Sequence, residues 1–396
     1  MTNINYRPYR EFFNEDWKSD TDFVSGVGGT TQTVLVSSLS DLPEPADGII
    51  TLAENTTYHF VGAVNIGTNR LRVQDNSHLT GDNWGRDAIV YTGTDYAIIV
   101  EAQKLNMKFM GVVAPAGGAI RFNSPSDKLT VFLCGFLAKD GCLIENAEVV
   151  SFKFCLFPDN SDVHLTFTGE IDKVLVDSSV FEAGDLALSF SSLAVGTIDI
   201  SGNYFKMEPG ATGILSNSVT ISNAGIIRGN SFEGDFTYTS GFDESTVGYT
   251  FTSNTGIPDS DVSGGYFSNT DQVITIATQD AWVPIADTFT ATDLQRMTFA
   301  DSALTYTGLR DYKGRVFVSL SGEAAQNNQT YELAVFKNGE ITNARSVVDY
   351  RFGDVSQSGS INSFLTLAEN DSFDVRIRNT TGTANFTLQT ISVTFN

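Results

Sequence analysis

The chain has 396 residues, of which 41% are hydrophobic and 18% are charged, so it is long enough for two or three folded domains and is not intrinsically disordered. Asp and Glu number 47 against 24 Lys and Arg, and the formal net charge of −23 disfavours nucleic acid and anionic lipid as partners. With three cysteines and no long apolar run, the sequence predicts neither a disulfide framework nor membrane insertion.

Residues 1–45 are expected to form an extended or partly helical N-terminal arm, with a glycine run at 26–29. Aromatic and basic side chains that cannot form a core of their own are typical of an interface, although an arm that packs along its own domain is an equal alternative. The arm residues concerned are Tyr6, Arg7, Tyr9, Arg10, Phe12, Phe13 and Trp17.

Residues 46–260 consist of short β-branched and aromatic segments separated by Gly, Asn and Asp, and this region repeats itself. Successive repeats end at marker residues separated by 24, 21, 24, 24 and 27 positions. The markers are Val112, Phe136, Phe157, Phe181, Phe205 and Phe232. A near-constant period of this length predicts a parallel β-helix of about eight coils.

Aligned repeats place equivalent residues in columns. We expect the marker phenylalanines to stack, and Asn203, Asn230 and Asn254 to form an amide ladder with a spacing of ~4.8 Å. Cys134 and Cys155 also share a column, and we expect them to be buried free thiols.

From residue 261 the periodicity ends. We interpret 261–275 as a linker and 276–396 as an antiparallel sandwich, because strongly alternating segments such as 315–320 and 373–377 follow and Asn338-Gly339 is a hairpin signal. The predicted fold class is therefore all-β.

Two resemblances add to this reading. The repeats resemble the right-handed parallel β-helix of pectate-lyase-like proteins and of phage tailspikes and fibres. Residues 331–339 and 367–375 resemble the jelly-roll head of the tumour-necrosis-factor and complement-type family, with Glu369-Asn370-Asp371 in place of the usual Gly-Asp turn. Both resemblances imply a homotrimer.

The order of arm, β-helix and jelly-roll head is similar to that of phage virion appendages. This resemblance implies a structural and host-recognition protein of the virion surface, made in the host cytoplasm. The arm would bind other virion proteins, and the shaft or tip would bind a host glycan or receptor. The sequence does not distinguish a tail fibre from a tailspike or a head fibre. The alternatives are a tailspike depolymerase, acting as a glycoside hydrolase or polysaccharide lyase, and a bacterial surface adhesin.

Four acids are candidates for depolymerase chemistry, which needs two carboxyl groups at a defined separation. They are Glu182, Asp185, Asp159 and Asp162. Glu182 shares its column with Lys206 and Glu233, so opposite charges alternate there, and we expect a structural rather than a catalytic role. His59, His78 and His164 lack metal-ligand spacing, and no metal or cofactor is expected.

Overall fold

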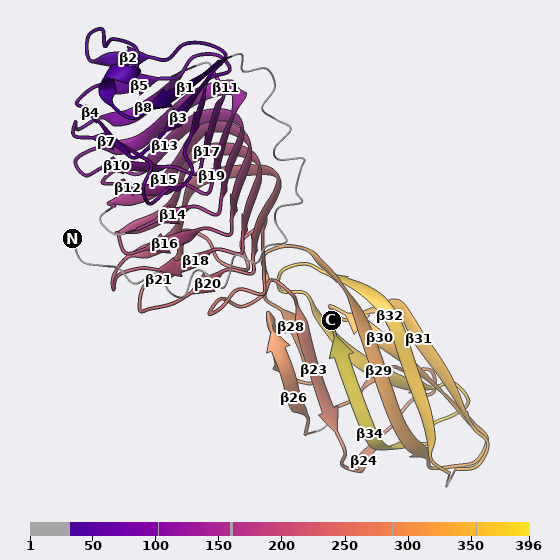
Figure 1. Cartoon of the computed structure of the whole chain (residues 1–396). Helices are drawn as coiled ribbons and strands as arrows, with labels where there is room; N and C mark the ends of the chain where they lie inside the picture. Colours follow the sequence, from indigo (N-terminus) through magenta and orange to yellow (C-terminus); the bar gives the residue numbers. More distant parts are fainter. Residues whose placement is uncertain (1–31, 102, 159–160, 287, 354) are drawn as a thin grey trace. The chain divides into compact units, whose positions relative to one another are not determined.

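The computed structural model describes residues 32–101, 103–158, 161–286, 288–353 and 355–396. The chain divides into two compact units, one reaching to Gly241 with Asn254–Gly256, and one of Phe242–Ser253 with Ile257–Asn396. Both units are built from strands (Figure 1), and the described residues include one short 3-10 helix, η3 (Leu39–Asp41). The all-β fold class is confirmed.

The first unit is a parallel β-solenoid, as predicted, whose coils contribute strands to three ladders. The first ladder comprises β1 (Gln32–Val36), β3 (Thr56–Phe60), β6 (His78–Thr80), β9 (Leu105–Lys108) and the second halves of β11 (Gly118–Phe132), β13 (Cys142–Lys153), β15 (Val163–Asp177), β17 (Leu186–Ser201) and β19 (Thr212–Arg228). The second comprises β4 (Ala63–Gly67), β7 (Ala88–Tyr91), β10 (Gly111–Ala114), β12 (Gly135–Ala138), β14 (Leu156–Phe157), β16 (Val180–Glu182), β18 (Tyr204–Lys206) and β20 (Ser231–Phe232). The third comprises β2 (Ile49–Thr51), β5 (Arg70–Arg72), β8 (Tyr96–Glu101), the first halves of the five long strands, and β21 (Thr237–Ser240).

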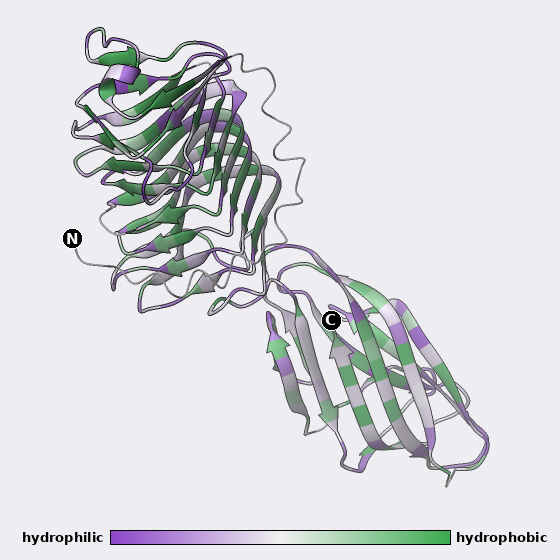
Figure 2. Ribbon diagram, in the orientation of Figure 1, coloured by the Kyte–Doolittle hydropathy of each residue, from purple (hydrophilic) through white to green (hydrophobic). Residues whose placement is uncertain are grey.

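Apolar residues alternate with polar ones along these strands (Figure 2), and the apolar side chains of successive coils are buried inside the solenoid. The marker phenylalanines form the predicted column, with centroids of neighbouring rings 4.7–5.2 Å apart from Phe136 to Phe232. This column is buried throughout, and it fixes the register of the coils because a slip by one residue would turn each ring outward.

The predicted asparagine ladder is also confirmed. Asn203 Nδ2 donates to Asn230 Oδ1 over 3.0 Å, and Asn230 Nδ2 donates to Asn254 Oδ1 over 2.9 Å. The same amides reach the backbone, where Asn230 Nδ2 donates to the carbonyl of Ile200. Towards the N-terminus the ladder continues through Ser179, whose backbone N–H donates to Asn203 Oδ1. These bonds give hydrogen-bond partners to the buried polar groups of the turns between the first and second ladders.

Between the first and second ladders, each of the six coils from β9 to β20 turns at one residue with positive φ. In the later coils this residue is Ser178, Gly202 or Gly229, and the two glycines adopt the left-handed region without steric cost. In three earlier coils it is Phe109 (φ 57°), Leu133 (φ 51°) or Phe154 (φ 55°). Bulky residues rarely adopt this conformation, so these three turns are strained for their residue type.

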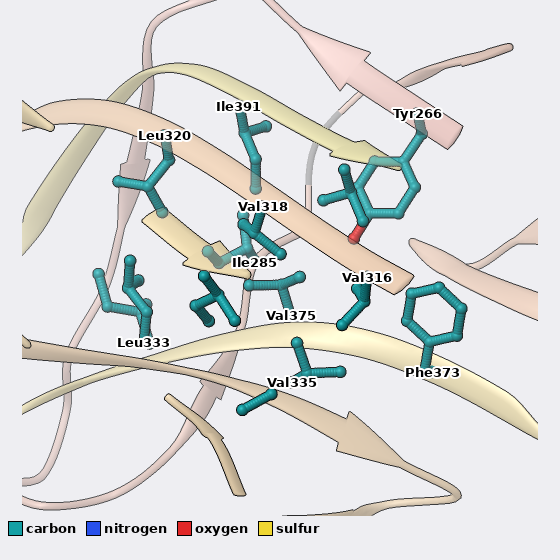
Figure 3. Close-up of a cluster of buried hydrophobic side chains, with 14 of the residues drawn as sticks. Tyr266, Ile285, Val316, Val318, Leu320, Leu333, Val335, Phe373, Val375 and Ile391 are labelled. Atoms are coloured by element: carbon teal, nitrogen blue, oxygen red, sulfur yellow. The ribbon is translucent and has the colours of Figure 1, made fainter. Parts of the chain in front are cut away.

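The second unit is the expected antiparallel sandwich. One sheet has the order β26 (Thr290–Gln295), β23 (Ser263–Ser268), β34 (Phe386–Phe395), β29 (Tyr312–Ala324), β32 (Gln357–Leu367), with β24 (Gln272–Ile274) also on β34. The other has the order β27 (Met297–Ala300), β28 (Ala303–Tyr306), β33 (Ser372–Asn379), β30 (Gln329–Lys337), β31 (Glu340–Tyr350), with β25 (Val283–Pro284) on β33. The unit also contains β22 (Tyr249–Thr252). Figure 3 shows Val316, Val318, Val335 and Val375 interdigitating in the core between the sheets.

Two expected boundaries differ from the structure. β1 lies inside the segment 1–45, where an arm was expected, and pairs in register with β3. The expected linker, 261–275, contains β23 and β24. Its glycines allow close packing rather than flexibility, since a Cβ on Gly265 would lie 2.8 Å from the carbonyl oxygen of Val393.

Candidate functional site

The acids singled out from the sequence do not form a buried pair among the described residues. Glu182 ends β16 opposite Lys206 and is half-buried. Asp185 is exposed in the following loop. Asp162 is also exposed, with a carboxylate oxygen 3.7 Å from Lys139 Nζ. Asp159 lies outside the described residues, as do Tyr6, Arg7, Tyr9, Arg10, Phe12, Phe13 and Trp17 of the expected attachment arm.

The one fully buried aspartate within the described ranges, Asp87, is a structural anchor. Its carboxylate accepts from Arg86 Nε over 2.7 Å and from the backbone N–H groups of Gly62, Asp82 and Asn83 over 2.8–3.0 Å. The Arg86 guanidinium, with these N–H donors, holds the pKa of Asp87 far below the usual aspartate range. Asp87 therefore remains an anion that closes the loop 81–87.

The histidines and cysteines do not form a metal site. No group of three His, Cys, Asp or Glu side chains suited to a metal occurs within the ranges that the structure describes. His164 is buried beside Phe157 and Phe181, and its Nε2 lies 3.1 Å from the carbonyl oxygen of Ala183. All three cysteines are buried free thiols, and burial raises the pKa of Cys134 to about 12. No helix in the described part of the chain is long and apolar enough to span a membrane.

A different surface has the character of a binding site, and we call it the Phe–Lys patch. It occupies two adjacent outward-facing columns over three coils, and it consists of Lys108, Phe109, Phe132, Leu133, Lys153 and Phe154. All six side chains are half-buried. Outward positions of a solenoid normally carry polar residues, so three aromatic rings gathered there need an explanation beyond packing.

The geometry of the Phe–Lys patch follows from strand register. Phe132, near the end of β11, lies opposite Lys108 of β9 and opposite Lys153 of β13. Its ring packs edge-on against Phe109 and Phe154, with centroid distances of 5.7 and 5.6 Å. Phe109 and Phe154 occupy the positive-φ turns described above. The rings therefore form a continuous aromatic surface, with a lysine on either side of its centre.

Sequence reasoning missed this patch because, apart from the charged column of Glu182, it compared columns that point inward. The same alignment contains the signal, since position three before the marker is Phe109, Leu133 and Phe154 in three coils but Ser178, Gly202 and Gly229 in the next three. A position that tolerates glycine and yet holds a large apolar side chain in several coils indicates selection for that side chain's surface.

No family model matches the sequence, and no curated protein matches it. Among solved structures, murine APRIL shares 10% identity over 34% of this chain and 99% of its own, with a TM-score of 0.26. Eiger TNF from S. frugiperda shares 14% identity over 34% of this chain and 91% of its own, with a TM-score of 0.26. The enzymatically active domain of bacteriophage CBA120 tailspike protein 4 shares 10% identity over 88% of this chain and 68% of its own, with a TM-score of 0.25. Likenesses of this size assign neither a family nor an activity.

Proposed function

We propose that this protein is a trimeric structural and host-recognition protein of a phage virion, and that it binds a glycan on the host surface. The observation that carries glycan recognition is the Phe–Lys patch. Stacked parallel strands and the turns that directly follow them hold its rings on a rigid support, and aromatic faces with polar groups beside them suit the alternating apolar and hydroxyl surfaces of a sugar.

The outer face of the sheet that contains β29, β32 and β34 supports a trimer. Phe317 and Phe364 on this face are 43% and 67% exposed. Apart from Lys313, Arg315 and Glu323, the outward residues of the three strands are uncharged and mostly Ser or Thr. In a chain with a net charge of −23, a face with so few acids fits the charge-depleted core of an interface, and we assign a second copy of the chain as its occupant.

Attachment to the virion through residues 1–31 is part of the same proposal. Aromatic and arginine side chains dominate interface energies, and this segment contains Tyr6, Tyr9 and Trp17 together with Arg7 and Arg10. Deletion of residues 1–25 should give a trimer that no longer joins particles, whereas a purely structural arm predicts a lower melting temperature instead.

Binding to cells tests the recognition function directly. Fluorescently labelled full-length protein is incubated with a panel of bacterial strains before and after periodate oxidation of their surface glycans. We expect at least one strain to bind the protein, and oxidation to abolish this binding. Equal binding to oxidised cells, or binding to none of the strains, would overturn glycan recognition.

The depolymerase alternative makes a separate prediction for the same strains. Release of reducing ends from purified capsule or lipopolysaccharide, lost on Glu182→Gln or Asp185→Asn, would establish a tailspike enzyme instead. Immunogold label on bacterial cells that carry no phage would favour the adhesin alternative.

A further inference from the structure

A buried histidine with an unsatisfied ring nitrogen lies beside the Phe–Lys patch. His78 of β6 is 2% exposed and pairs in register with Asn106 of β9. Its Nδ1 lies 3.2 Å from Asn106 Nδ2, an amide that can only donate, so the proton of a neutral ring is on Nε2. His78 Nε2 is buried and has no hydrogen-bond partner in the described structure. Such groups are rare and call for an explanation.

Two lysines flank this histidine. Lys104 lies two residues before Asn106 and Lys108 lies two residues after it. Both side chains therefore leave the strand on the same face as Asn106, which is the face that carries His78. Burial and the nearby charges of Lys104 and Lys108 lower the pKa of His78, which is therefore neutral at pH 7. Neither lysine has a carboxylate oxygen within 4.0 Å among the residues described. Three donors thus lie on one face, and among the described residues they have no acceptor.

We infer that His78, Lys104 and Lys108 form an anion-binding corner that takes the carboxylate of an acidic saccharide, while Phe109, Phe132 and Phe154 hold the apolar faces of its sugar rings. This inference rests on the proposed glycan recognition and adds the ligand class. Lysine side chains are flexible, so one carboxylate can engage both ammonium groups. The Nε2–H of His78 is buried, so a bond from it to the same carboxylate requires a neighbouring side chain to move aside.

Charge and geometry both favour this ligand. The corner presents two cations that have no carboxylate partner among the described residues, in a chain of net charge −23, so an acidic group is attracted to this place although the protein as a whole repels it. Lys108 belongs to both the corner and the patch, which makes the two surfaces continuous. Neighbouring coils are about 4.8 Å apart, which is close to the length of one sugar residue. A saccharide chain that crosses the coils can therefore contact successive phenylalanine rings.

Calorimetry with the full-length protein tests the inference. The acidic probes are oligogalacturonate, hyaluronan hexasaccharide and colominic acid, and fully methyl-esterified oligogalacturonate is the matched neutral probe. We expect at least one acidic probe to bind, with an affinity that falls as salt rises. Lys104→Gln/Lys108→Gln should weaken that binding at least about tenfold, because charge-assisted hydrogen bonds are lost. Phe132→Thr should weaken it roughly two- to tenfold.

The control variant is Lys139→Gln/Lys173→Gln, which changes the net charge equally at positions outside the corner and the patch. It should bind the acidic probe with the same affinity as the wild type.

Three results would overturn the inference: no binding of any acidic probe, equal affinity for the esterified probe, or unchanged affinity in Lys104→Gln/Lys108→Gln. Equal competition by hexaglutamate would overturn it in favour of an acidic protein partner. If neutral glycans alone bind, the inference fails and glycan recognition stands. If the protein binds neither glycans nor cells, both the inference and the proposed glycan recognition fail.

Discussion

Phe181 shows how one side chain supports three coils of the solenoid. Its ring stacks on Phe157 at 4.8 Å and on Phe205 at 5.0 Å, with interplanar angles of 4° and 9°, and it is fully buried. Removing this ring leaves a void that neither neighbour can fill, because each is held by its own backbone ladder.

We therefore expect Phe181→Ala to lower the free energy of unfolding by about 3–5 kcal/mol, the usual range for an aromatic side chain lost from a core. Thermal and urea unfolding of the full chain measure this loss in the free energy of unfolding. Phe132→Ala, which removes an outward-facing ring, is the control and should cost clearly less. Equal melting of Phe181→Ala and the wild type would contradict the stacking of the coils.

Asp87 gives a pH-dependent prediction at the same scale. Because the folded-state pKa lies far below the ordinary 3.8, ionised Asp87 stabilises the fold fully above that ordinary value, and the contribution is lost as pH falls towards the folded-state pKa. Asp87→Asn should therefore melt lower than the wild type at pH 7, and this difference should narrow below about pH 4. Exposed Asp185→Asn is the control. A difference that does not vary with pH would rule out this role of the charge.

Substitution of His78 distinguishes a role in ligand binding from a role in stability. A buried donor without a partner destabilises a fold, so an apolar residue of similar size should be tolerated. The substitution also removes the acceptor of Asn106 Nδ2, so we expect His78→Leu to melt near the wild-type temperature and to weaken the binding of acidic saccharides. Lower stability with unchanged binding would show that the ring is only structural. His59→Leu, which removes an imidazole that contacts Thr80 at 3.0 Å, is the matched control.

At the scale of elements, the asparagine ladder connects strands that lie far apart in the sequence. Asn230 bonds to Asn203 and Asn254 through side-chain amides and also satisfies the carbonyl of Ile200. The two amide–amide bonds have the same direction, from Asn203 to Asn230 and from Asn230 to Asn254, so Asn230 accepts from one neighbouring coil and donates to the next. Loss of one member leaves unpaired groups in both neighbours.

Asn230→Ala should consequently destabilise the solenoid by about 3 kcal/mol or more, since several buried donors and acceptors lose their partners. Hydrogen exchange of the full chain is the measurement, and the loss of protection should centre on β18, β19 and β20. Asn217→Ala, at an exposed position on β19, should leave exchange unchanged. Loss of protection confined to the mutated turn would contradict a continuous ladder.

Inward-facing columns were predictable because packing forces them to repeat: Phe157 and Phe205 must match Phe181, and Asn203 must match Asn230. Features without that constraint were not predictable. β1 has only one buried side chain, Val36, and η3 rather than a marker phenylalanine follows it, so the repeat was not visible there. The Phe–Lys patch faces solvent, where no neighbouring coil dictates the residue.

At the scale of the molecule, the proposed trimer would form through the exposed sheet face of the sandwich. A second copy that covers Phe317 and Phe364 would remove two large apolar side chains from water. Closed symmetry is the usual outcome for copies of one chain, and a trimer is the closed assembly that we propose.

We expect sedimentation analysis of the full chain to give three times the 42.9 kDa chain mass, and Phe317→Ser/Phe364→Ser to give monomers with an intact circular dichroism spectrum. Val347→Ser, which changes a side chain that is 62% exposed on the other sheet, should remain trimeric. A monomeric wild-type chain at micromolar concentration would contradict the assembly.

The repeating columns also have a genetic consequence. Each coil presents the same inward set to the coil before it and the coil after it, and three of the five measured intervals are 24 residues. In-frame duplication of one such segment would insert a coil whose phenylalanine and turn residue find equivalent neighbours on both sides. Recombination within the gene can therefore lengthen the solenoid, or multiply the outward surface of a chosen coil, without first solving a new packing problem.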